Sequence, residues 1–133
     1  MEQTDILSLL RENMTKAHAP YSKFNVGSVI VSTDGKFYSG CNVENAAYPL
    51  GVCAEAGAIS AMIQNGSKGI HEIYVMGAGD ALVTPCGGCR QKIREFSTAN
   101  TRIHICGPEG LRQSFTIEDL LPFSFGPDNL KHE

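Results

Sequence analysis

The sequence has 133 residues, of which 42% are hydrophobic and 19% charged, a composition typical of a globular protein. This length predicts one domain spanning residues 1–133, with a core that needs no disulfide bridges. The net charge of −3, with no run of basic residues, argues against nucleic acid as a partner, and no apolar run approaches the length of a membrane span.

The start of the chain and its cysteines bear on the compartment. The first five residues are acidic and polar and lack the basic start and apolar segment of a signal peptide. The five cysteines are an odd number, which argues against a disulfide framework. We therefore expect a cytoplasmic protein. Two of the cysteines, Cys41 and Cys106, fall in or beside strand-like stretches and are interpreted as core residues.

The first third of the chain predicts a helix followed by a β-hairpin. Apolar residues recur at helical spacing over residues 4–18. Residues 24–33 are β-branched and almost continuously apolar, as in a strand covered on both faces. Asp34-Gly35 is a hairpin turn signal, and the second strand is expected over residues 36–43.

A polar segment follows this hairpin. Strand alternation places Asn42 and Glu44 on the same side of an extended backbone. An amide and a carboxylate projecting together suit the hydroxyl groups of a sugar, because one can donate and both can accept hydrogen bonds. The alternative is a polar loop that leads into the next helix.

The remaining elements complete an α/β pattern. Helices are expected over residues 53–64 and 86–96 and from residue 116, and strands over residues 71–76, 101–106 and 111–116, the last at a sheet edge. The order α-β-β-α-β-α-β-β-α predicts a three-layer α-β-α sandwich around a five-stranded mixed sheet. Functional groups should gather where the strands end and the helices begin.

Three cysteines and one carboxylate stand at the starts of the two middle helices. Cys86 and Cys89 are three residues apart, so both thiols lie on one face of the first helical turn, and Cys53 opens the other helix. The positive end of a helix favours thiolates. Three thiolates can hold zinc tetrahedrally and leave the fourth position to water. Glu55, two residues after Cys53, is placed to move the protons of that water.

Two other readings of these cysteines remain open from the residues alone. A structural zinc site needs a fourth ligand, which would have to be Cys41, Cys106 or a histidine. A redox pair formed by Cys86 and Cys89 would leave Cys53 and Glu55 without a role.

The motifs resemble those of the small, homotetrameric, zinc-dependent cytidine deaminases. Cys53–Glu55 combines with Pro85–Gln91 into the zinc deaminase signature. The family's other elements correspond to Pro20–Gly27, Asn42–Asn45 and Leu120–Pro127. The resemblance spans nearly the whole chain and implies a cytidine deaminase-like fold.

The resemblance implies an activity and a metal. The reaction would be hydrolytic deamination of cytidine and deoxycytidine to uridine and deoxyuridine with release of ammonia, in pyrimidine salvage. Cys53, Cys86 and Cys89 would hold one zinc ion per subunit. Glu55 would carry protons from the attacking water to the base N3 and to the leaving amine, and we expect its pKa to be raised beside the anionic metal site.

The resemblance also implies a nucleoside site. Asn42 and Glu44 would hold the ribose hydroxyls, Phe24 would pack on the pyrimidine, and the Ala54 backbone would help to read the base. The expected partner is thus a small nucleoside.

A homotetramer with shared active sites is implied as well, because Tyr48 and Phe125 would enter a neighbouring subunit's pocket. One position departs from the family: many relatives carry arginine directly after the catalytic glutamate, whereas this chain has Ala56. Arg90 could point toward Cys53 or Cys89. The alternatives are a deaminase of a modified cytosine nucleoside and a non-catalytic zinc-binding scaffold, and the sequence does not set the preference between ribose and deoxyribose.

Overall fold

The structure is a computed structural model that describes residues 3–130. Its strands form one sheet in the order β2-β1-β3-β4-β5. Only the central pair β3–β4 is parallel, so the sheet is mixed as predicted. The strands are β1 (Val26–Ser32), β2 (Phe37–Cys41), β3 (Ile70–Gly77), β4 (Arg102–Gly107) and β5 (Gly110–Phe115).

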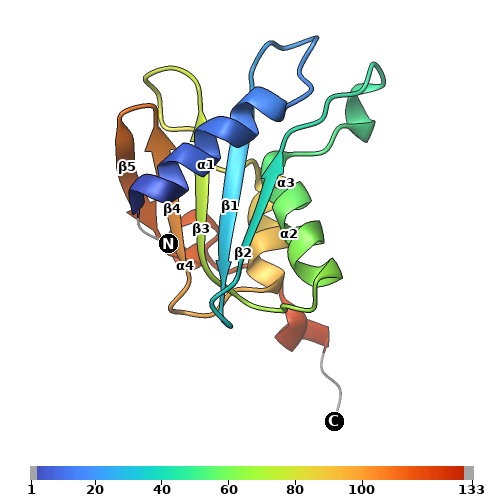
Figure 1. Cartoon of the computed structure of the whole chain (residues 1–133). Helices are drawn as coiled ribbons and strands as arrows, with labels where there is room; N and C mark the ends of the chain where they lie inside the picture. Colours follow the sequence, from blue (N-terminus) through green and yellow to red (C-terminus); the bar gives the residue numbers. More distant parts are fainter. Residues whose placement is uncertain (1–2, 131–133) are drawn as a thin grey trace.

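Helices cover both faces of this sheet and complete the predicted three-layer sandwich. The first helix lies across one face, and the second and third helices pack behind the sheet on the other (Figure 1). The α-helices are α1 (Gln3–Lys16), α2 (Ala54–Gln64), α3 (Gly87–Glu95) and α4 (Ile117–Leu120), and the 3-10 helices are η1 (Tyr48–Leu50) and η2 (Pro127–Leu130). Among residues 3–130, none of the helices is both long and apolar enough to cross a membrane.

A hydrophobic cluster fills each side of the sheet. The cluster under α2 and α3 is the larger and is built from buried side chains that include Ile30, Met62 and Ile93. The cluster under α1 includes Leu10 and Met76. Strand β1 is buried along most of its length, as its continuous apolar run predicted.

Several element boundaries differ from the prediction by one or two residues, and two of the differences share one cause. Helix α1 ends at Lys16, and β2 ends at Cys41 instead of continuing to residue 43. The backbone N–H of His18 donates to Asn42 O at 2.9 Å, and that of Glu44 donates to His18 O at 2.7 Å. The chain after α1 therefore pairs with the segment after β2, which draws both out of their regular elements.

A close approach at Gly40 sets the position of α2. A Cβ atom at residue 40 would lie 2.4 Å from Ala54 O and 2.5 Å from Ala58 N. Real Cβ atoms essentially never come this close to backbone. The absent side chain at Gly40 therefore lets the first turns of α2 lie directly on β2.

Candidate active site

The three predicted thiols meet at the starts of two neighbouring helices. Cys53 and Cys86 are the N-cap residues of α2 and α3, and Cys89 lies in the first turn of α3. The sulfur atoms of all three lie within 4.8 Å of one another, and the Sγ atoms of Cys53 and Cys86 are 3.9 Å apart. Cys53 and Cys86 are 33 residues apart in sequence, and the packing of their two helices brings their sulfur atoms into one cluster.

This cluster fits a zinc ion. With Zn–S bonds of about 2.3 Å, the sulfurs of a tetrahedral site lie about 3.8 Å apart. The 3.9 Å between Cys53 and Cys86 matches that spacing. Among residues 3–130, no fourth cysteine, histidine or carboxylate joins the group. The donor set therefore leaves one tetrahedral position for a ligand from outside the chain, and the four-ligand alternative loses its support.

The remaining cysteines do not share one environment. Cys106 is buried on the opposite face of the sheet, in the cluster under α1. Cys41 is only half-buried. The prediction of a core residue is therefore confirmed for Cys106, whereas Cys41 lies at the end of β2, an edge strand, where it keeps access to solvent.

The thiols differ in how easily they ionise. Burial raises the pKa of Cys53 and of Cys89, while the backbone N–H of Cys89 lowers the pKa of Cys86. The backbone N–H at the start of α3 thus favours the thiolate of Cys86, as expected for a helix N-terminus, whereas burial opposes ionisation of the other two thiols. A bound metal cation removes this penalty, because a coordinating thiol is deprotonated outright.

Glu55 lies in the first turn of α2 and is only 5% exposed. Burial raises the pKa of its carboxyl group, and the charge of Lys92 partly opposes this effect. The sequence predicted the same direction from the anionic metal site, whereas burial is the cause found here. A raised pKa makes a carboxylate a better proton acceptor, which suits a group that has to take a proton from water.

A hollow of about 330 Å³ opens beside the sulfurs, within the range of about 300–1,000 Å³ that is usual for small-molecule sites. Two larger hollows, of about 570 and 470 Å³, lie elsewhere and contain none of the predicted site residues. The 330 Å³ hollow brings together seven of the predicted residues and five others. It is lined by Ser22, Phe24, Val26, Asn42, Glu44, Cys53, Ala54, Glu55, Val75, Val83, Thr84 and Cys86.

Asn42 connects the two strands of the hairpin at the edge of this hollow. Its Nδ2 donates to Phe24 O at 2.8 Å, and its Oδ1 accepts from Val26 N at 2.8 Å. The carboxamide keeps one further N–H and one further lone pair. Asn42 therefore fixes the backbone that carries Phe24 and still has hydrogen-bonding capacity for a ligand.

Glu44 is held by the turn that precedes β1. Its Oε1 accepts from Tyr21 N at 3.0 Å and Ser22 N at 3.1 Å, and its Oε2 accepts from Ser22 Oγ. The Ser22 hydroxyl and the two backbone N–H groups lower the pKa of this carboxyl group. Glu44 is thus ionised and oriented before any ligand arrives, a role for Ser22 that the turn-like sequence did not reveal.

The remaining predicted residues separate into two groups. Ala54 is fully buried in the wall of the hollow, directly beside Glu55. Tyr48 and Phe125 are 74% and 57% exposed and lie outside the lining of the hollow within their own subunit. Tyr48 makes an edge contact with Tyr21 at 5.9 Å between ring centroids, and the backbone O of Phe125 accepts from Gln91.

The loop between β3 and α3 supplies lining residues that the sequence analysis missed. Val83 and Thr84 line the hollow, and Val83 and Phe24 both reach over Gly77 at the end of β3. A Cβ at residue 77 would lie 3.0 Å from Val83 and 3.1 Å from Phe24. The only available signal was the position of this loop directly before Pro85 and Cys86.

Arg90 points away from the sulfurs. Its guanidinium donates to Pro85 O, to Leu120 O and to Thr84 Oγ1 at 2.8–3.1 Å. It therefore ties the loop before α3 to the end of α4 instead of facing Cys53 or Cys89. Ala56, which stands where many relatives have arginine, lines a neighbouring hollow together with Lys92. The charge of Lys92 acts on Glu55, so this chain has a cation near the site although it lacks that arginine.

Comparison with known proteins gives the family. Residues 1–105 match the family model described as the cytidine and deoxycytidylate deaminase zinc-binding region. A cytidine deaminase of Sporosarcina psychrophila is 32% identical over 132 residues, which is 99% of this chain and 97% of that relative. The chain belongs to the cytidine and deoxycytidylate deaminase family.

Solved structures of cytidine deaminases share this fold across almost the whole chain. The crystal structure of the cytidine deaminase from Burkholderia pseudomallei is similar with a TM-score of 0.87 and 35% identity, covering 94% of this chain and all of that one. The cytidine deaminase from Mycobacterium tuberculosis gives a TM-score of 0.78 at 30% identity, covering 95% and 99%. Zinc is the cofactor of this deaminase site, since the family model is a zinc-binding region and the three sulfurs fit the ion.

Proposed function

We propose that this protein catalyses the hydrolytic deamination of cytidine and deoxycytidine to uridine and deoxyuridine with release of ammonia, in pyrimidine salvage. The observation that carries this proposal is the cluster of three sulfurs, within 4.8 Å of one another, beside a buried carboxyl group in a nucleoside-sized hollow. The family membership supports the same reaction class.

The metal ligands and the proton carrier are assigned within this proposal. Cys53, Cys86 and Cys89 would hold one zinc ion per subunit. When bound, the ion supplies Lewis-acid chemistry that lowers the pKa of water toward neutral. Glu55 accepts a proton from the attacking water and delivers it to N3 of the base. It then takes the remaining proton from the hydroxyl group that has added to C4 and passes it to the amine, so that ammonia leaves and C4 keeps a carbonyl oxygen. Its burial supports this role, because a carboxyl group shielded from solvent can hold and release a proton without exchanging it with bulk water.

The chain's other residues bind and orient the nucleoside. Phe24 packs on the pyrimidine ring, and the Ala54 backbone contacts the base beside Glu55. Asn42 and Glu44 bind the ribose hydroxyls, which is supported by their place in the lining and by their remaining hydrogen-bonding capacity.

The charge of the hollow favours a nucleoside over a nucleotide. The described lining contains the carboxyl groups of Glu44 and Glu55 and no lysine or arginine. A phosphate group placed here would face two carboxyl groups without a cation to bind it. We therefore assign the unphosphorylated substrate.

We also propose a homotetramer with shared active sites. Tyr48 and Phe125, exposed and outside the lining of their own hollow, would complete the hollow of a neighbouring subunit. Exposed apolar side chains near them, such as Leu50 and Phe123, support a contact with another chain. A fully active monomer in solution would contradict this assembly.

Residues 1–133 are proposed to form one domain, which is supported by a single sheet whose two faces carry one hydrophobic cluster each. A cytoplasmic location is proposed from the five free cysteines, which suit a reducing compartment.

The decisive test compares the wild type with Glu55→Gln in a spectrophotometric assay on cytidine, deoxycytidine and cytosine. We expect the wild type to deaminate both nucleosides. The variant should keep its zinc and its fold and lose several orders of magnitude in kcat, because the amide cannot carry a proton. Near-normal turnover by the variant would remove Glu55 from the mechanism. A zinc-loaded wild type without activity on any of the three compounds would contradict the proposed function. The two alternatives would then be a non-catalytic zinc-binding scaffold and a deaminase of a modified cytosine nucleoside.

A further inference from the structure

The loop that carries Val83, Thr84 and Cys86 to the active site has little support of its own. Residues 79–85 make no backbone–backbone hydrogen bond within the described part of the chain. Two arginine side chains bind the loop instead, at three of its carbonyl groups and at the hydroxyl group of Thr84. Arg90 binds the second half of the loop, at Thr84 and Pro85.

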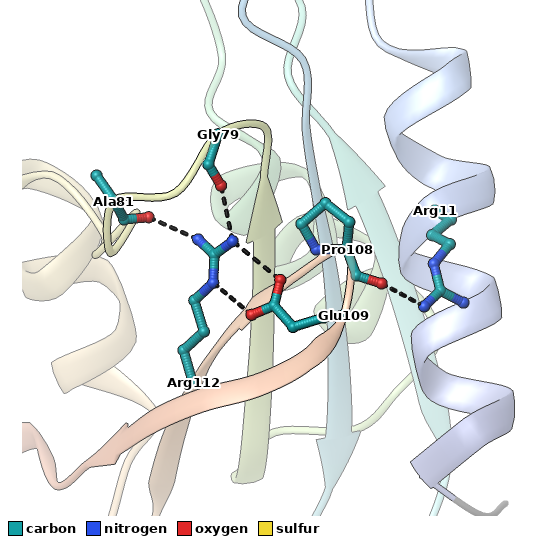
Figure 2. Close-up of polar contacts among 6 residues, drawn as sticks. All are labelled: Arg11, Gly79, Ala81, Pro108, Glu109 and Arg112. Carbon is teal, nitrogen blue, oxygen red and sulfur yellow. Dashed lines mark hydrogen bonds and ion pairs between the residues drawn. The ribbon is translucent and has the colours of Figure 1, made fainter.

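Arg112, on the edge strand β5, binds the first half. Its Nη1 donates to Ala81 O at 2.8 Å and its Nη2 donates to Gly79 O at 2.7 Å (Figure 2). The two loop residues are 31 and 33 positions away in sequence. The Arg112 side chain is only 14% exposed, so the guanidinium is packed into the molecule.

The guanidinium is itself held in place by Glu109. Glu109 accepts from Arg112 Nε at 2.7 Å and from Nη2 at 3.0 Å. The turn that carries Glu109 is tied to α1, because Arg11 Nη2 donates to Pro108 O at 2.6 Å (Figure 2). Bidentate arginine pairs of this kind fix the direction of the remaining N–H groups, which lysine cannot do.

A glycine makes room for this arrangement. A Cβ at Gly107 would lie 2.2 Å from the Arg112 guanidinium carbon. The guanidinium therefore lies directly against the backbone of β4. The clash would be with the end of a flexible side chain, so an alanine at this position would displace the guanidinium and leave the strand in place.

From these contacts we propose that Arg112 is a positioning residue for the nucleoside pocket: by holding Gly79 and Ala81, it sets the place of Val83 against the substrate base. Arg112 does not touch the hollow, and its effect passes through the loop. This inference rests on the proposed function for its kinetic consequence, whereas the hold on the loop is independent of the substrate.

The kinetic test uses Arg112→Ala and Gly107→Ala, which remove or displace the same guanidinium by different means. We expect each to raise KM for cytidine by at least about tenfold, the lower end of what a contact of methylene size is worth. The kcat and the zinc content should stay within about threefold of wild type, because the sulfurs, Glu55 and the Arg90 contacts are untouched. Arg102→Ala is the matched control. Arg102 lies at the start of β4, at the other end of the strand from Gly107, and its guanidinium donates to the carbonyl groups of Ala99 and Thr101 and not to the loop.

The second readout is proteolysis by thermolysin, which cleaves before bulky apolar residues and can cut at the exposed Leu82 or at Val83. The first cut should fall at these residues and should be at least about tenfold faster in Arg112→Ala and Gly107→Ala than in the wild type or Arg102→Ala. A variant that merely melts at a lower temperature, with an unchanged KM and no faster cut at this loop, would overturn the proposal. If the wild type does not deaminate cytidine, the proposed function fails, and the proteolysis still decides the role of Arg112.

Discussion

The close approach of β2 and α2 at Gly40 allows a direct test of how α2 positions the active site. In Gly40→Ala, the new Cβ would lie 2.4 Å from Ala54 O and 2.5 Å from Ala58 N, whereas ordinary contacts begin at 3.4 Å. The start of α2 must then move away from β2 by about 1 Å, which is the shortfall between these distances. The obstructing atoms are backbone, so no side chain can rotate to make room.

This shift has a cost in stability and a cost in activity. Overpacking of a well-packed interface destabilises by about 1–3 kcal/mol, and the rigid backbone at Gly40 places this variant toward the upper end. With an m-value of about 2 kcal/mol/M, the urea midpoint should fall by about 1 M or more. Cys53 and Glu55 stand at the start of α2, and a displacement of about 1 Å in a catalytic group can cost about 100-fold in rate.

Gly57→Ala is the matched control, because it adds the same methyl group on the opposite side of the same interface. Its Cβ would meet Cys41 O and the Gly40 Cα at 3.7 Å, which is ordinary van der Waals contact. Replacing a glycine in a helix interior with alanine stabilises by about 0.5–1 kcal/mol. We therefore expect Gly57→Ala to be at least as stable as the wild type and to keep its activity.

The measurement is urea unfolding at one fixed protein concentration, together with kcat, KM and the zinc content of the folded fraction. A fixed concentration is needed because subunit association would otherwise shift the midpoint. The reasoning is refuted if Gly40→Ala unfolds within about 0.5 kcal/mol of the wild type, the range usual for surface substitutions. It is equally refuted if the two alanine variants are destabilised alike, because the effect would then not come from the close approach.

Three further outcomes follow from the site and its supports. Cys53→Ala should lose stoichiometric zinc, and full occupancy by elemental analysis would contradict the assigned ligand set. Thr116→Ala removes the capping box of α4, in which Thr116 Oγ1 accepts from Asp119 N at 3.1 Å, and should cost about 1 kcal/mol in urea unfolding with KM unchanged. The pKa of Glu44 is lowered by its bonds to Ser22 and Tyr21, so its hold on this turn is complete above the ordinary carboxyl pKa and is lost only as the pH falls through the lowered value. An NMR titration of the Glu44 carboxyl carbon with a midpoint at or above the ordinary value would exclude these bonds in solution.

The parts of the site that the sequence predicted are those fixed by local geometry. The spacing of Cys86 and Cys89 is that of one helical turn, so their shared face follows from the chain itself. The alternation that joins Asn42 to Glu44 is equally local, and both line the hollow. The order of the elements followed from periodicity and turn residues, and the structure confirms it.

The parts that could not be predicted depend on contacts between distant segments. Arg90 could be directed toward the sulfurs or away from them, and the carbonyl groups of Pro85 and Leu120 decide the matter. The pKa shifts of Cys53 and Cys89 depend on how deeply neighbouring elements bury them, which helix position alone does not give. Arg112 reads in sequence as an ordinary strand residue, because its partners Gly79 and Ala81 lie in another loop.

Two glycines, Gly40 and Gly77, allow the close packing that brings the proposed catalytic and binding residues to one hollow. At Gly40, the bare strand lets α2 descend far enough for Glu55 to be buried beside the sulfurs. At Gly77, the absence of a side chain at the end of β3 leaves room for both Phe24 and Val83 over the strand. Asn42, directly after β2, holds the backbone of Phe24, and Arg112 on β5 holds the loop of Val83, so each wall is tied to a strand of the sheet or to the residue that follows one. In the proposed mechanism, the sheet is therefore the common support that sets the distance between the base and Glu55. A change at either glycine should alter that distance before it alters the chemistry of any catalytic group.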